Sequence, residues 1–192
     1  MLLIAIFALA ATLGSIGTYA AVTIDQRRES QIVIGLAEIH LETARRRIGL
    51  VEERWQRSRA LYETGVVSTT EVLRDERAVQ AERATVRRRE LDLAEVLLSG
   101  REPDDRLSAP RVGGTDFVSE RLKTDLDALR IDVDLATQRA EQSRALHRDG
   151  FVTETEVMRD EAAVRSARHA IDALEASLAL RHAFLDGAHT AL

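Results

Sequence analysis

Five histidines are the side chains with the clearest potential for chemistry in this chain: His40, His147, His169, His182 and His189. Neutral imidazole is a common ligand for zinc, copper and nickel. A helical metal site usually places two histidines four residues apart on one face, and no such pair occurs here. The absence of cysteine excludes thiolate ligands, thiol nucleophiles and disulfides. We therefore predict no metal site and no cofactor, and keep a histidine-based metal sensor as an alternative.

Carboxylates and arginines are abundant but form no catalytic pattern. Glu42 with Arg46 and Glu53 with Arg57 have the four-residue spacing of ion pairs on an exposed helix face. The arginine triplets at 45–47 and 87–89 are interrupted by acidic neighbours and lack an aromatic platform for bases. The formal net charge is -5, and no phosphate loop or nucleophile motif is present. We predict neither an enzyme nor a nucleic-acid-binding protein.

The composition favours helices over sheets. Only 4% of the 192 residues are aromatic and only two are proline, whereas 31% are charged and 45% are hydrophobic. Sandwiches and barrels depend on aromatic and β-branched strands punctuated by turns. An all-α chain is the expectation.

An internal repeat with an offset of 85 residues organises the chain. Residues 58–79 and 143–164 share 14 identities in 22 positions, including Gly65 with Gly150. Glycine commonly ends a helix, and Ser68-x-x-Glu71 and Thr153-x-x-Glu156 match the capping box that begins one. Each copy of the repeat therefore predicts an antiparallel helical hairpin.

The predicted domains are a first hairpin at 29–99, a linker at 100–115 that holds both prolines, and a second hairpin at 116–187. The helices should span 29–63, 69–99, 116–149 and 154–186 in an elongated, up-down-up-down unit. Apolar and small residues recur at spacings of three and four or of seven, which is typical of coiled-coil packing. The residues that form these inner stripes on the two ascending helices include Ala37, Leu41, Ala44, Ile48, Leu122, Leu126, Leu129 and Val133.

The second helix carries a further apolar face, at Ala84, Leu91, Ala94 and Leu98. One antiparallel partner would not cover it. This surplus predicts packing between the hairpins or between subunits. We also expect a homo-oligomer.

The segment at 1–24 contains no charged side chain and is long enough to cross a hydrocarbon core of about 30 Å. Thr18-Tyr19-Ala20 offers a signal-peptidase site before Ala21, although a basic region before the apolar run is missing. We expect a signal peptide or a membrane anchor, with the body exported. Arg27 and Arg28 support the alternative of a cytoplasm-facing anchored protein.

The first hairpin tip resembles that of the periplasmic adaptor proteins of tripartite efflux pumps. The likeness lies in Arg57-x-x-x-Leu61-x-x-x-x-x-x-Ser68, to which Gln142, Leu146 and Thr153 correspond in the second repeat. Two hairpins with tips at one end also resemble the outer-membrane efflux proteins of the TolC-like type. The β domains of both families have no counterpart here, so the resemblance covers the helices and tips.

This resemblance implies an assembly surface at the tips, where adaptor and tunnel meet in both families. Apolar pairs beside the tip glycines, Val66-Val67 and Phe151-Val152, have two interpretations. They either contact the ends of their own helices or bind a partner. The candidate docking residues are Arg57, Leu61, Gly65, Val66, Ser68, Leu146, Gly150, Phe151 and Thr153.

The function that follows is a non-catalytic coiled-coil component of an envelope efflux or secretion assembly. It would be periplasmic, anchored in the inner membrane or exported after cleavage, and would bind protein partners of that assembly. The alternative is a membrane-tethered coiled-coil spacer or envelope scaffold unrelated to transport.

Overall fold

The computed structural model traces the backbone of residues 2–190 and describes the side chains of residues 27–187. Four α-helices make up the fold: α1 (Leu2–Glu63), α2 (Thr69–Ser99), α3 (Phe117–Arg148) and α4 (Glu154–Thr190). The predictions of an all-α chain and of two hairpins are confirmed. The α2 bounds agree with the prediction, α3 is shorter by one residue at each end, and α4 continues to Thr190.

The predicted signal or anchor segment at 1–24 lies outside the residues whose side chains are described. Helix α1 is continuous through this region, whereas the sequence predicted a helix from residue 29. Among the residues that the structure describes, no helix is both long and apolar enough for a membrane span.

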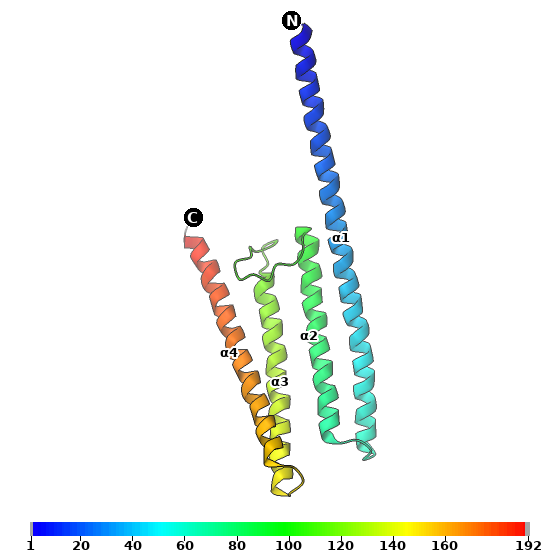
Figure 1. Ribbon diagram of the computed structural model, residues 1–192, viewed down its shortest axis with the longest axis vertical. Helices are drawn as coiled ribbons and strands as arrows, with labels where there is room; N and C mark the ends of the chain where they lie inside the picture. Colours follow the sequence, from blue (N-terminus) through cyan, green and yellow to red (C-terminus); the bar gives the residue numbers. More distant parts are fainter. Residues whose placement is uncertain (1, 191–192) are drawn as a thin grey trace.

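The helices lie side by side in a single row, in the order α1, α2, α3, α4 (Figure 1). Each helix contacts its neighbours in the chain, and α1 and α4, at the two edges of the row, do not touch within the described region. The α1–α2 and α3–α4 turns lie at one end of the row, while the α2–α3 linker lies at the other (Figure 1). The molecule is therefore an open layer of helices, and each edge helix has only one neighbour.

The inner stripes predicted from the heptad spacing are buried in part. Leu41 and Ala44 of α1 and Leu126 of α3 are buried, as is Val79 of α2. Leu41 and Leu126 are equivalent positions of the repeat, so the two hairpins pack in the same register. Because a single layer of helices encloses little volume, long contact length replaces core thickness.

Two buried arginines bind the α2–α3 linker to the ends of the helices that lie opposite the hairpin turns. We call this end of the row the base. Arg121 of α3 forms ion pairs with Asp92 and Glu95 of α2, the latter at 2.6 Å from Nη1 to Oε2. Its Nη2 donates to the Asp104 carbonyl oxygen at 2.9 Å, and Nε lies 2.7 Å from Asp105 Oδ1. The guanidinium thus holds the start of the linker and the two neighbouring helices together.

Arg181 of α4 does the same for the end of the linker. Its Nη1 donates to the carbonyl oxygens of Leu107 and Ala109 at 2.8 and 2.6 Å. Its Nη2 donates to Oδ1 of Asp116 at 2.8 Å, and Asp116 is the residue that caps α3. Burial alone would raise the pKa of Asp116, but hydrogen bonds from Arg181 and Ser119 outweigh it and hold that pKa below its usual value.

Candidate docking site at the hairpin tips

Both tips are built by the same helix-ending motif. At the first tip, Gly65 N–H donates to the Tyr62 carbonyl and Val66 N–H to the Leu61 carbonyl, each at 2.9 Å. At the second, Gly150 N–H donates to His147 at 3.0 Å and Phe151 N–H to Leu146 at 2.9 Å. This is the Schellman pattern, which needs a left-handed residue at the position after the helix. The φ angles of Gly65 and Gly150, 74° and 80°, explain why glycine stands in both copies of the repeat.

The helices that leave the tips begin at the predicted capping residues, but the two caps differ. Thr153 Oγ1 accepts from the Glu156 N–H at 3.3 Å, and Glu156 Oε2 accepts from the Thr153 N–H at 2.8 Å. These two bonds complete a capping box, and the Thr153 N–H, followed by its hydroxyl, lowers the pKa of Glu156. At the first tip, Ser68 Oγ accepts from the Glu71 N–H at 3.3 Å, while the Glu71 carboxylate pairs with Arg74.

Exposed apolar side chains mark both tips. Val66 is 68% exposed and Phe151 is 76% exposed, so neither packs on the end of its own helix to any large extent. Leu61 is also exposed, whereas Leu146 is half-buried. The apolar side chain that follows each tip glycine is therefore available to a partner at the same end of the molecule.

A buried carboxylate ties the two helices of each hairpin together below the tip. In the first hairpin, Ser58 donates to Asp75, and Arg54 Nε lies 3.1 Å from Asp75 Oδ1. The Asp75 carboxylate is buried. Because its partners come from α1 and Asp75 comes from α2, this cluster fixes the register of the hairpin close to its turn.

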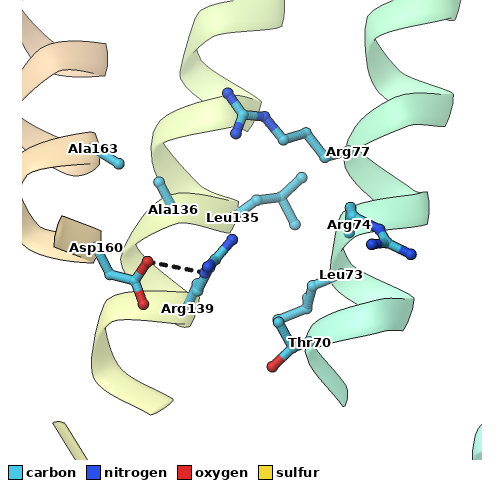
Figure 2. A pocket seen from close by; sticks show the side chains of 9 residues that line it. All are labelled: Thr70, Leu73, Arg74, Arg77, Leu135, Ala136, Arg139, Asp160 and Ala163. Carbon is cyan, nitrogen blue, oxygen red and sulfur yellow. Dashed lines mark ion pairs between the residues drawn. The ribbon is translucent and has the colours of Figure 1, made fainter. Parts of the chain in front are cut away.

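The second hairpin repeats this cluster at the equivalent positions. Ser143 donates to the buried carboxylate of Asp160. Arg139 Nε lies 3.0 Å from Asp160 Oδ1, and Figure 2 shows this ion pair. The repeat had identified both serines and both aspartates as identical positions. It had not identified the arginines, which lie one turn before the aligned segment; extending the alignment by four residues would have found them.

Arg57 differs from the arginines of these clusters. It is exposed, and among the described residues it forms no ion pair, so the predicted pair with Glu53 is not formed. The other predicted pair, Glu42 with Arg46, is present at 3.1 Å on an exposed face. The structure therefore leaves the Arg57 guanidinium accessible on the same helix as Leu61.

The histidines lie apart from one another. His40, His147, His169 and His182 are exposed, and His189 lies outside the described side chains. Within residues 27–187, no group of three His, Asp or Glu side chains is placed to hold a metal ion. His147 is the one at a tip, where its Nδ1 lies 2.9 Å from the Val152 carbonyl oxygen.

No protein-family model matches the sequence, and no curated protein or solved structure matches it significantly. The likeness to efflux components therefore stays a prediction made from the tip motif and the hairpin arrangement.

Proposed function

We propose that this chain is a non-catalytic, membrane-directed component of an envelope efflux or secretion assembly that docks a protein partner through its two hairpin tips. The observation that carries the proposal is the pair of exposed apolar side chains, Val66 and Phe151, each held beyond the last turn of a helix at the same end of the row.

Rigid presentation of these side chains supports a docking role. Each follows a glycine in a fully hydrogen-bonded turn, and each turn stands on a hairpin whose register is fixed by a buried aspartate. A turn whose backbone is already fixed loses less conformational entropy when a partner covers it. Aromatic residues such as Phe151 are enriched in the cores of protein interfaces.

The membrane-directed segment at 1–24 supports placement in the envelope, with the body exported. Helix α1 would then run from the membrane side to the tip, which is the direction needed to carry the docking surface away from the bilayer. An α-helix rises about 1.5 Å per residue, so helices of more than 30 residues are also long enough to act as a spacer.

Site-specific photo-crosslinking in the native host would test the proposal. A photoreactive side chain at position 66 or 151 should give a cross-linked product that contains a transporter or secretion component, identified by mass spectrometry. The control is position 97 on α2, where Leu97 is similarly exposed but distant from the tips. Tip positions that give no product, or the same product as position 97, would overturn the proposal and favour the spacer or scaffold.

A second test uses charge to block the apolar contact. The double variant Val66→Asp with Phe151→Asp should abolish the tip cross-links from a neighbouring probe position and raise the accumulation of an efflux dye in the host. Leu97→Asp should do neither.

Fractionation with N-terminal sequencing of the mature chain would establish the compartment, and a body found in the cytoplasm would contradict the proposed envelope location.

A further inference from the structure

The 85-residue repeat makes each hairpin a reference for the other, and the two differ sharply at one pair of equivalent positions. Helix α1 has Trp55 where α3 has Ala140. The aspartate clusters below the tips form at equivalent positions in both hairpins, so the helices of both pack in the same register. The surroundings of these two positions can therefore be compared residue by residue.

In the first hairpin, an aromatic side chain and an ion pair occupy this level of the α1–α2 contact. Trp55 is half-buried, and the Arg59 guanidinium carbon lies 5.8 Å from the centre of its ring. Val79 of α2 is only 2% exposed. Arg83 Nη2 of α2 lies 2.8 Å from Glu52 Oε1 of α1, so an ion pair spans the two helices beside the indole.

The second hairpin has an open groove at the equivalent place. It lies between α3 and α4 and has a volume of about 350 Å³, which is within the range of small-molecule sites. Ala140 and Val164 form its apolar part. Val164 is partly exposed, whereas its equivalent Val79 is buried. Alanine thus leaves open the space that an indole fills in the first hairpin.

Two further replacements leave positive charge without a partner in this groove. Thr137 stands where α1 has Glu52, so Arg168 lacks the carboxylate that its equivalent binds in the first hairpin. Arg165 stands where α2 has a glutamine. Within residues 27–187, neither Arg165 nor Arg168 forms an ion pair or a hydrogen bond. The groove therefore offers two guanidinium groups whose donors are unused.

The other charges of the groove leave it positive. Arg144 Nη2 lies 2.8 Å from Glu161 Oε1, so these two side chains neutralise each other. Glu141 replaces a glutamine of α1 and has no ion-pair partner in the described part of the chain. With three arginines against two glutamates, the lining has a net positive charge.

We propose that this groove binds a small aromatic carboxylate. The ring takes the place that Trp55 holds in the first hairpin and packs against Ala140 and Val164. The carboxylate pairs with Arg165 and Arg168, whose forked donors match its two oxygens. An aromatic ring is favoured over an aliphatic one because arginine also stacks on ring faces. This inference does not depend on what the tips bind.

Isothermal titration calorimetry of the full chain in a mild detergent, with 2-naphthoate as the probe, tests the proposal. The fused rings of this carboxylate resemble an indole in size, and binding should saturate at one ligand per chain. Two matched probes separate the contributions: 2-naphthamide keeps the rings without the charge, and cyclohexanecarboxylate keeps the charge without an aromatic ring. Each should bind at least about tenfold more weakly. Titration into detergent alone gives the background.

Single substitutions test the assigned residues. Ala140→Trp should abolish binding, because it fills the groove with the side chain of the first hairpin. Arg168→Gln should weaken binding by at least about tenfold, and Glu141→Gln should strengthen it by removing an opposing charge. The matched control is Arg83→Gln, the same change at the equivalent position of α2, which should leave binding unchanged. Circular dichroism should stay helical in all four variants.

The first hairpin permits a gain-of-function test. Trp55→Ala, Glu52→Thr and Gln80→Arg together reproduce the groove there and should raise the stoichiometry from one ligand per chain to two. Trp55→Ala alone should not, because Glu52 still pairs with Arg83.

Four results would overturn the inference: no saturable heat with 2-naphthoate, equal affinity for either matched probe, unchanged binding by Ala140→Trp or Arg168→Gln, or a folded triple variant that still binds one ligand. Val66→Asp with Phe151→Asp should leave naphthoate binding unchanged. Each of the four results is compatible with tips that cross-link to a partner, so a failure here is distinguishable from a failure of the proposed function.

Discussion

Ser58 on α1 donates a hydrogen bond to the buried carboxylate of Asp75 on α2. Its equivalent in the second hairpin, Ser143 with Asp160, lies 85 residues further along the chain. A hydrogen bond that is retained in both copies at a buried carboxylate joins the two helices of each hairpin just below the turn. Because the repeat places the same serine and aspartate in both hairpins, both tips are stabilised by the same hydrogen bond.

We predict that the carboxylate, more than the arginine beside it, stabilises each hairpin. Asp75→Ala should lower the free energy of unfolding by about 2–3 kcal/mol, because it removes charge-assisted hydrogen bonds at a buried site. Arg54→Ala should cost less than about 1 kcal/mol, since its side chain is 63% exposed and screened by water. Urea denaturation followed by circular dichroism measures both, and an Arg54 variant as unstable as the Asp75 variant would contradict this ranking.

We predict that replacing the buried Arg181 lowers the stability of the chain far more than replacing an exposed arginine. Arg181→Met should lower the free energy of unfolding by about 3–5 kcal/mol, because it removes the donor to two linker carbonyl groups and the cationic partner of the Asp116 carboxylate, which keeps only its bonds from Ser119. Arg46→Met is the matched control, and should change stability by less than about 0.5 kcal/mol because its pair with Glu42 is exposed. Equal effects in thermal melts would mean that the buried cluster contributes little.

The Asp116–Arg181 pair should also make stability depend on acid. The pKa of Asp116 is lower in the folded chain than the ordinary aspartate value, so the folded state favours the ionised carboxylate. Its contribution is present above about pH 4, the ordinary aspartate pKa, and is lost as the pH falls through the lower folded-state value. Asp116→Asn should therefore destabilise the chain at pH 7 and converge with the wild type in strong acid. A difference between the two that stays constant from pH 7 to pH 2 would exclude this pair as the cause.

Two glycines of the first hairpin should respond to alanine in opposite directions. Gly65 has a φ of 74°, where a side chain is strained, so Gly65→Ala should cost about 1 kcal/mol. Gly49 lies inside α1, and an added Cβ there would meet nothing within 4 Å. Gly49→Ala should therefore stabilise the chain by about 0.5–1 kcal/mol. Denaturant midpoints measure both changes, and a Gly49→Ala variant less stable than the wild type would contradict this prediction.

Local signals made much of this architecture predictable. Helix ends depend on a few neighbouring residues, so Gly65 and Gly150 with the capping residues Ser68 and Thr153 located both turns. The heptad spacing is also a local pattern, and it predicted that Leu41 and Leu126 would be buried. The 85-residue repeat also predicted both tips at one end, because the chain returns to the opposite end before the second hairpin begins, and the structure has this arrangement (Figure 1).

The roles of the buried arginines were not predictable, because each depends on groups that the folded chain brings together. Arg181 lies 65 residues from Asp116, and Arg121 meets carboxylates from both α2 and the linker. In the sequence neither differs from the many arginines on exposed helix faces. Burial distinguishes them, and burial is a property of the packed helices and linker.

The local patterns of amino acids were thus sufficient for the helices, their ends and their pairing into hairpins. They were not sufficient for the arrangement of the hairpins. The apolar face at Ala84 and Leu91 was compatible with packing between hairpins or between subunits, and the folded chain uses this side of α2 for contact with α3. The physical reason is that a helix surface records which residues must be covered, whereas the identity of the covering surface depends on how distant segments meet.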